Sequence, residues 1–156
     1  MVGKKIDGIE VSNAVKNILK NAVEKLKSEN VIPCLATILV GNDPASATYV
    51  KNKHTACDAV GIKTKDFKLS AETTQEQLND VIHKLNHDKD VHGILVQLPL
   101  PNQLDEFATI SSIFPIKDVD GLTPQNVGLL TIGKSVLKPC TPSGIMEMFY
   151  YYKIEL

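Results

Sequence analysis

Hydrophobic positions along the chain switch between helical and strand-like spacing. Between Ile9 and Leu26 apolar residues recur at steps of three and four, which predicts an amphipathic helix. Short apolar runs occupy 34–41 and 91–98, and apolar and polar residues alternate over 62–69. Each of these three runs predicts a β-strand, and the strand at 91–98 is apolar enough for the centre of a parallel sheet.

Two further helices are predicted between the strands. One begins at Asn42 or Asp43, which can cap its first turn, and ends at Gly61, which can adopt a left-handed conformation. The other spans 73–86 and is opened by Thr73 or Thr74, with a glutamine or glutamate placed for a capping box. Alternating strands and helices at this spacing predict an α/β domain of three layers, αβα, with a mostly parallel sheet.

After Pro99 the regular alternation of predicted strands and helices ends. Loops rich in proline and aspartate follow, and we expect one more helix over 144–156. Loops that follow strand ends are where α/β domains usually place their functional groups.

Composition narrows the class of protein. A chain of 156 residues with 43% hydrophobic and 22% charged residues fits one globular domain, here 1–156. A net charge of −1 gives no broad attraction to nucleic acid or to a membrane, so neither is an expected partner. The three cysteines are far apart and form no C-x-x-C pair, which favours reduced thiols and a cytoplasmic location.

Tyr49 and Lys53 are the first candidate pair. Four residues apart on the predicted helix, they share one face and can point into one pocket. Burial there would favour the neutral, proton-accepting form of the lysine. The alternative is a pair of solvent-exposed side chains. The same pair marks short-chain dehydrogenases, but that class needs a glycine-rich turn, and this sequence contains no G-x-G.

Other candidates have ordinary explanations as well as functional ones. Gln97 is the polar residue at the end of an apolar strand, and its amide must find a partner in the loop or in a site. Asp118 and Asp120 can bind a metal or a ligand, although Asp-Gly also favours simple turn chemistry. His83 and His87 lack further ligands for zinc, so we expect a solvated helix face and no metal site.

Four motifs together carry a specific resemblance. "LVGNDPASATYVKNK", "GILVQLPLP", "KDVDGLTPQNVGLL" and "PCTPSGI" occur in this order. The chain resembles, over nearly its whole length, the N-terminal catalytic domain of the bifunctional methylenetetrahydrofolate dehydrogenase/methenyltetrahydrofolate cyclohydrolase family. The resemblance implies oxidation of 5,10-methylenetetrahydrofolate with NADP (NAD in some members). It also implies hydrolysis of the product to 10-formyltetrahydrofolate, the one-carbon donor of purine synthesis.

The resemblance also implies roles for individual residues. Lys53 is expected to be the main catalytic group, Tyr49 to stack on the aminobenzoyl portion of the folate, and Gln97 to hydrogen-bond Lys53. Asp120 is expected to accept hydrogen bonds from the pterin. Residues with less individual weight at the substrate pocket are Ser46, Val96 and Leu98.

In this family a Rossmann-type domain follows the folate-side domain, and its nucleotide-binding motifs do not occur in 1–156. We therefore expect NADP to be bound by that missing domain, and the parent enzyme to be a homodimer. The alternative is a non-catalytic folate-binding fragment that needs a separate nucleotide-binding domain.

Overall fold

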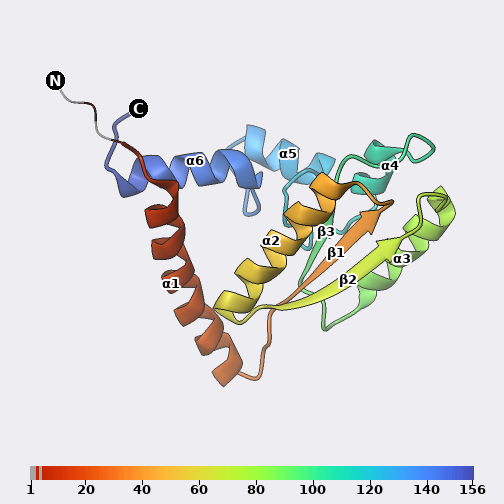
Figure 1. Cartoon of the computed structure of the whole chain (residues 1–156), viewed down its shortest axis with the longest axis horizontal. Coiled ribbons are helices and arrows are strands. Elements are labelled where there is room, and N and C mark those ends of the chain that lie inside the picture. The colour runs from red at the N-terminus through yellow and green to blue at the C-terminus, as the bar shows by residue number, and fades with distance from the viewer. Residues whose placement is uncertain (1–2, 4) are drawn as a thin grey trace.

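The computed structural model describes residue 3 and residues 5–156 (Figure 1). Helices and strands alternate in its first part, and helices connected by loops form the rest. The elements are α1 (Gly8–Ser28), β1 (Cys34–Val40), α2 (Pro44–Val60), β2 (Lys63–Leu69), α3 (Gln75–His87), β3 (Gly93–Val96), α4 (Glu106–Ser111), α5 (Pro124–Thr131) and α6 (Cys140–Tyr151).

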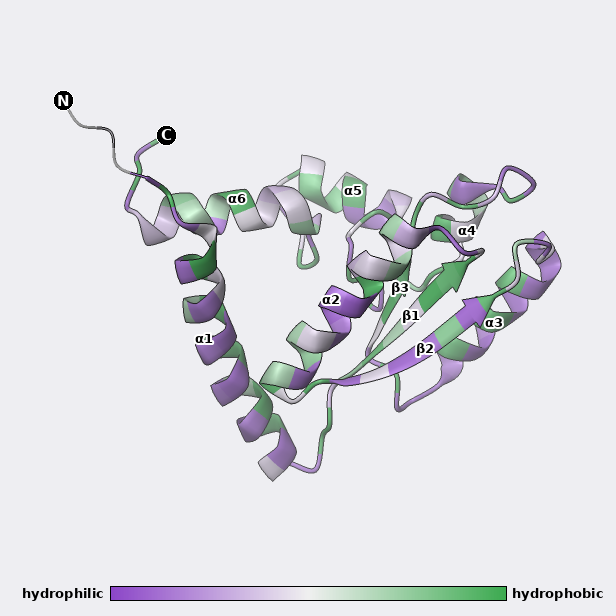
Figure 2. Ribbon diagram, viewed as in Figure 1, coloured by the Kyte–Doolittle hydropathy of each residue, from purple (hydrophilic) through white to green (hydrophobic). Residues whose placement is uncertain are grey.

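The three strands form a parallel sheet in the order β2-β1-β3. Cys34 pairs with Lys63 at one end of β1, and Val40 pairs with Leu69 at the other. The hydropathy colouring of Figure 2 contrasts the apolar β1 with the mixed β2, as expected for a central strand and an edge strand. The predicted parallel α/β sheet is therefore confirmed.

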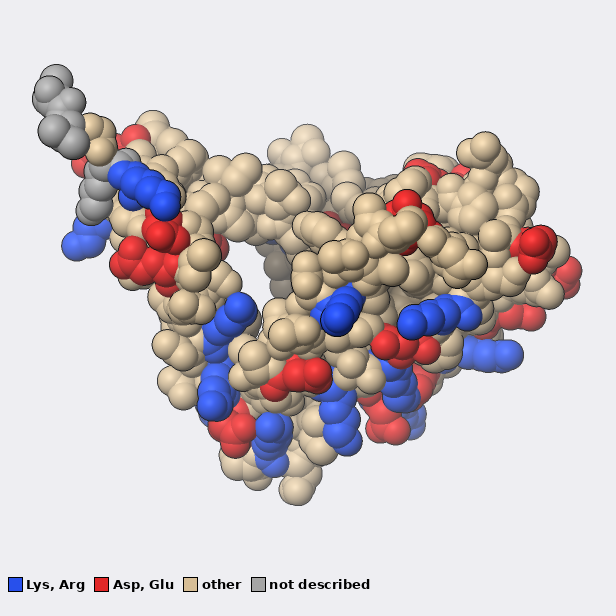
Figure 3. Space-filling model, in the orientation of Figure 1, with Lys and Arg blue, Asp and Glu red and all other residues tan. Residues whose placement is uncertain are grey.

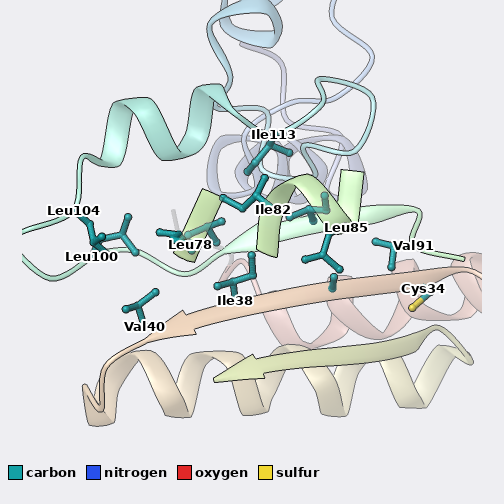
Figure 4. Close-up of a cluster of buried hydrophobic side chains, with 13 residues drawn as sticks. Cys34, Ile38, Val40, Leu78, Ile82, Leu85, Val91, Leu100, Leu104 and Ile113 are labelled. Atoms are coloured by element: carbon teal, nitrogen blue, oxygen red, sulfur yellow. The ribbon is translucent and has the colours of Figure 1, made fainter. Parts of the chain in front are cut away.

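The main hydrophobic core lies between β1 and α3 (Figure 4). Ile38 on β1 and Leu78 and Ile82 on α3 are completely buried. Alternate residues of a strand face opposite sides of a sheet, so Ala36, Ile38 and Val40 all meet α3. The neighbouring residue Thr37 faces the other way and contacts α2. Helices on both faces of the sheet give the expected three layers.

Local sequence signals place α2 and α3. Asp43, not Asn42, caps α2 by accepting a hydrogen bond from the backbone of Ser46 at 2.7 Å. Gly61 ends α2 with a φ of 85°, which glycine adopts without strain. Thr74, not Thr73, opens α3 in the capping box, and Gln77 completes that box.

The first helix packs on α2 and α6 rather than on the sheet (Figure 1). Val11 and Val23 are its buried residues, whereas Ile18 on the same helix is 69% exposed. The predicted amphipathic helix is present, but Leu19 and Leu26 among its apolar positions are also exposed. In the described part of the chain, no helix has the length and hydropathy that a membrane crossing requires.

Two expectations about the later part of the chain are wrong. The region after Pro99 is not only loop, because α4 begins at the cap Asp105 and α5 begins at the cap Thr123. Both caps were visible in the sequence, but the helices are too short to show hydrophobic periodicity. The last helix spans Cys140–Tyr151 instead of 144–156, so its first turn includes the "PCTP" segment.

β3 is a short side strand, not the central strand of the sheet. It covers Gly93–Val96 where 91–98 was expected. Its residues are nevertheless buried, because a bridge from Ile94 to Asp118 covers its outer edge. Burial on both faces and at the edge explains why the strand has the composition of a central one.

Candidate functional site

A cleft of about 270 Å³ lies between α2, the end of β3 and the start of α6. It opens beside the carboxyl end of β3, the edge at which parallel α/β sheets usually bind ligands. The residues that line it are Tyr49, Lys53, Val96, Gln97, Leu98, Asp120, Leu122, Pro139, Cys140, Thr141 and Pro142. Six of the seven predicted site residues therefore line one cleft, although they come from three separate segments.

Tyr49 and Lys53 project from one face of α2 into this cleft. The Lys53 Nζ lies 5.0 Å from the centroid of the Tyr49 ring, which is within the range of a cation–π contact. Lys53 is half-buried and Tyr49 is 58% exposed. The pair therefore presents an aromatic surface and a nitrogen to any molecule in the cleft.

Gln97 supplies an acceptor at the floor of the cleft. Its backbone N–H donates to Ile38 at 2.8 Å and extends the sheet by one residue. Its side-chain Nε2 donates to the Leu98 carbonyl at 2.7 Å. The Oε1 is buried without a hydrogen-bond partner among the described residues. The hydrogen bond between Gln97 and Lys53 that the resemblance implies is thus not formed here, and Oε1 remains available to a donor.

The two aspartates of the "KDVDG" turn have different environments. Asp118 is buried and accepts hydrogen bonds at 2.8 Å from the backbone of Thr123 and from the Asn126 side chain. Burial alone would raise the pKa of Asp118, but these hydrogen bonds outweigh it and lower the pKa. Asp118 therefore holds the loop together, and Asp120 is the aspartate that lines the cleft.

Gly121 brings the start of α6 against the Asp120 turn. Its φ is 64°, and a Cβ at this position would lie 2.9 Å from the backbone carbonyl carbon of Lys138. Only glycine fits both the conformation and the close approach. The consequence is that Pro139 and Cys140 lie in the wall of the cleft.

Cys140 is a residue that the sequence reasoning did not select. Burial, followed by the neighbouring Asp120 carboxylate, raises the pKa of its thiol to about 11. Its Sγ donates to the Val119 carbonyl at 3.6 Å. The neutral thiol is thus a donor beside Asp120. Its position in the "PCTPSGI" motif was the sequence feature that could have marked Cys140 as a residue of the site.

Ser46 is the one predicted site residue that the structure does not bring into the cleft. It is buried in the first turn of α2 and its backbone N–H is bound by Asp43. Val96 and Leu98 line the cleft on either side of Gln97. Ser46 therefore seats the helix that carries Tyr49 instead of lining the cleft.

The two histidines of α3 do not line the cleft and are exposed. Their ring centroids are 4.4 Å apart, and the Nδ1 of His87 is hydrogen-bonded to the His83 carbonyl. Over the described residues, no cluster of three or more His, Cys, Asp or Glu side chains is placed to hold a metal ion.

A larger apolar hollow of about 650 Å³ adjoins the cleft. It lies between α1, α2 and α6, and Tyr49 and Cys140 line both spaces. Figure 3 shows this hollow between α1 and the body of the molecule, with charged side chains gathered mainly below it. The hollow offers mostly apolar surface, whereas the smaller cleft contains the converging polar groups, and we place the chemistry there.

Comparison with known proteins identifies the family. Residues 6–120 match the tetrahydrofolate dehydrogenase/cyclohydrolase catalytic domain. The bifunctional protein FolD of Nitrosopumilus maritimus is 65% identical over the whole chain, which covers 54% of that relative.

Solved structures agree. The bifunctional enzyme FolD of Campylobacter jejuni is 47% identical and superimposes with a TM-score of 0.93 over 96% of this chain and 53% of that one. The methylenetetrahydrofolate dehydrogenase-cyclohydrolase of Trypanosoma brucei, complexed with NADP and an inhibitor, is 38% identical with a TM-score of 0.91, over 96% of this chain and 52% of that one. The chain spans about half the length of the relatives it matches, and it belongs to the tetrahydrofolate dehydrogenase/cyclohydrolase family as a catalytic domain.

Proposed function

We propose that these residues form the folate-binding, catalytic part of a methylenetetrahydrofolate dehydrogenase/methenyltetrahydrofolate cyclohydrolase of one-carbon metabolism. The observation that carries the proposal is the convergence of Tyr49, Lys53, Gln97 and Asp120 on one cleft. These four come from a helix, a strand end and a turn, so a shared cleft is not a consequence of sequence proximity. Family membership supplies the substrate class.

In the proposed complex, Asp120 faces the pterin and Tyr49 faces the aminobenzoyl ring. A carboxylate can accept two hydrogen bonds from the ring N–H and amino group of a pterin, which is a charge-assisted contact. The exposed ring of Tyr49 offers a flat surface for stacking. Lys53 then lies between these two anchors, beside the one-carbon unit that joins the pterin to the aminobenzoyl group.

The proposed hydrolysis needs proton transfers that Lys53 can perform. Water adds to the carbon of the cationic 5,10-methenyl group, and one of its protons leaves to the Lys53 amine. The bond from this carbon to N5 then breaks and N5 takes up a proton, while the second proton of the water leaves as the oxygen becomes the formyl oxygen of 10-formyltetrahydrofolate. The net reaction consumes one water and releases one proton. The positive charge of the bound substrate disfavours a second cation beside it and so favours the amine form of Lys53.

Gln97 is proposed to hold the side-chain nitrogen of Lys53 in place. Its Oε1 is buried and has no hydrogen-bond partner among the residues that the structure describes, which is a costly state for an amide oxygen. A donor from Lys53 or from the substrate would satisfy it. The family role of Gln97 as a partner of Lys53 is compatible with this acceptor, once the lysine turns away from the Tyr49 ring.

Oxidation of 5,10-methylenetetrahydrofolate requires NADP, and we place its binding outside these residues. A dinucleotide is usually held by a glycine-rich turn at a helix N-terminus, and 1–156 contains no G-x-G. The residues described here therefore do not fit the cofactor, and no hydride-transfer step is assigned to them.

Hydrolysis of 5,10-methenyltetrahydrofolate by the purified protein tests the proposal. The absorbance of the methenyl cation disappears as the formyl product forms, and calorimetry measures folate binding in parallel. We expect both binding and hydrolysis above the buffer rate. Binding without hydrolysis would favour the non-catalytic folate-binding fragment. If the protein neither binds nor hydrolyses folate, the proposal is wrong.

A further inference from the structure

His54 lies on α2 immediately after the candidate catalytic residue Lys53, but it faces the sheet. Ser46, Val50 and His54 are spaced by four residues and form one stripe of the helix. Ser46 and Val50 are buried, and the His54 side chain is 18% exposed. His54 is therefore the third residue of the stripe through which α2 packs on the strands.

Three side chains from three elements meet at this histidine. The His54 Nε2 is 2.7 Å from the Asp66 Oδ1 on β2 and 3.0 Å from the Thr37 Oγ1 on β1. Thr37 is buried and its hydroxyl donates to the same Asp66 oxygen at 2.7 Å. The three polar atoms thus form a closed triangle that joins α2 to both strands.

The supply of protons fixes the tautomer of His54. An ionised aspartate only accepts hydrogen bonds, and the single hydroxyl proton of Thr37 is already given to Asp66. The proton shared by the remaining two contacts must therefore lie on the Nε2 of His54. This N–H is divided between Asp66 and Thr37, so the ring orientation is fixed by two acceptors at once.

Fixing His54 also fixes the helix that carries Lys53. The hydrogen-bonded backbone makes a helix turn as one rigid unit, so a rotation of α2 at His54 swings Lys53 by the same angle. We propose that His54 is a positioning residue, which sets the direction of Lys53 in the cleft through its contacts with Thr37 and Asp66. The proposal deepens the proposed function and rests on it for its kinetic consequence.

The triangle borders a separate opening of about 360 Å³, which His54 and Asp66 help to line. Lys51 of α2 and Lys68 of β2 also line this opening. Both are cations and neither can accept a hydrogen bond from His54. Asp66 is therefore the charged acceptor that faces the ring.

Two substitutions of His54 test the proposal, with a matched histidine as control. His54→Leu keeps the approximate size and the helical preference but removes the N–H, whereas His54→Gln returns an amide N–H donor. His83→Leu makes the same chemical change at an exposed position of α3. Circular dichroism and thermal unfolding establish that each variant folds.

One readout follows the position of Lys53 without requiring activity. The side-chain CH₂ protons next to Nζ are expected to be shifted upfield by the Tyr49 ring, because that nitrogen lies 5.0 Å from the ring centroid. NMR of protein labelled at lysine measures this shift, and Lys53→Gln assigns the signal. We expect His54→Leu to abolish the upfield shift, and His54→Gln and His83→Leu to keep it. A folded His54→Leu protein with the upfield shift intact would overturn the proposal.

The second readout separates positioning from stability. With 5,10-methenyltetrahydrofolate, we expect His54→Leu to lower kcat about tenfold while KM changes less than about twofold, and His54→Gln to restore most of kcat. A lower unfolding temperature with unchanged kcat would show a purely structural role and contradict the proposal. If the unsubstituted protein shows no hydrolysis, the proposed function fails, and the NMR shift alone then decides the role of His54.

Discussion

The Nζ of Lys53 lies 5.0 Å from the centre of the Tyr49 ring, so the two side chains form a single unit on α2. The ring holds the lysine nitrogen by a cation–π contact on one face and leaves much of its surface exposed. In the proposed complex the same ring would contact the folate. The Tyr49 ring would thus serve both the catalytic nitrogen and the substrate.

Two substitutions of Tyr49 distinguish the contribution of its ring to folate binding from that of its hydroxyl. Tyr49→Phe keeps the aromatic surface, so we expect folate affinity and hydrolysis to remain within about threefold. Tyr49→Ala removes the aromatic surface, and we expect folate binding to weaken by about 0.5–1.5 kcal/mol, the scale of an aromatic stacking contact. Calorimetric titration measures the difference. Equal affinities for the two variants would show that the ring does not touch folate.

Asp120 is predicted to bind the substrate without supporting the fold. Asp120→Ala removes a charged acceptor in the cleft, which should lower folate affinity by about 1.5–3 kcal/mol and leave the unfolding temperature nearly unchanged. Asp120→Asn tests the charge separately, because an amide can accept one hydrogen bond but lacks the negative charge. Unchanged affinity in Asp120→Ala would return this residue to simple turn chemistry.

Asp118, in contrast to Asp120, is predicted to support the fold. Asp118→Ala leaves the buried Thr123 and Asn126 donors without their partner, which should cost about 1–3 kcal/mol in the free energy of unfolding. Asp80→Ala on the exposed face of α3 is the control and should change stability little. Urea unfolding of both variants measures the difference.

The contribution of Asp118 should also depend on pH. Because the folded-state pKa of this carboxyl is lowered, its stabilisation is present above the unfolded-state pKa of about 3.9 and is lost as pH falls through the lower folded-state value. Asp118→Ala should therefore show a weaker loss of stability in acid than the unsubstituted protein. Parallel acid profiles for the two proteins would contradict the assigned hydrogen bonds.

Cys140 should react slowly with alkylating reagents although the residue is exposed. Burial of the thiol and the adjacent Asp120 raise its pKa to about 11, so little thiolate is present at neutral pH. Alkylation measured by peptide mass spectrometry should keep accelerating beyond pH 10. Because an ordinary thiol has a pKa of about 8.5, a rate that levels off near pH 9 would show that the thiol is not shielded as the structure indicates.

Local signals in the sequence predicted most of the layered fold. Apolar runs and caps fix α2, α3 and the strands, because Asp43, Thr74 and Gly61 act within one or two turns of the backbone. The position of β3 in the sheet was not predictable in this way. Its edge is covered by Asp118, a contact between segments distant in sequence, and burial gives it the composition of a central strand.

Residues of the candidate site could be predicted only where they belong to a recognisable sequence motif. Tyr49, Lys53, Gln97 and Asp120 were selected through their motifs, and the structure places all four in one cleft. Ser46 shares a motif with Tyr49 but lies four residues before the buried Val50, on the stripe of α2 that faces the sheet. Cys140 lies in the "PCTPSGI" motif, but its contact with Val119 and those of His54 with Thr37 and Asp66 join segments that only folding brings together, so spacing did not predict them.

Hydrolysis by lysine variants tests the central claim most directly. Lys51 lies two residues from Lys53 on α2 but does not line the cleft, so Lys51→Gln and Lys53→Gln are the same chemical change on the same helix. We predict that Lys53→Gln lowers kcat for hydrolysis of 5,10-methenyltetrahydrofolate by at least about a hundredfold, the typical contribution of a general base, while Lys51→Gln keeps the parental rate. Circular dichroism confirms that both variants fold. A folded Lys53→Gln protein that hydrolyses the substrate at close to the parental rate would contradict the account.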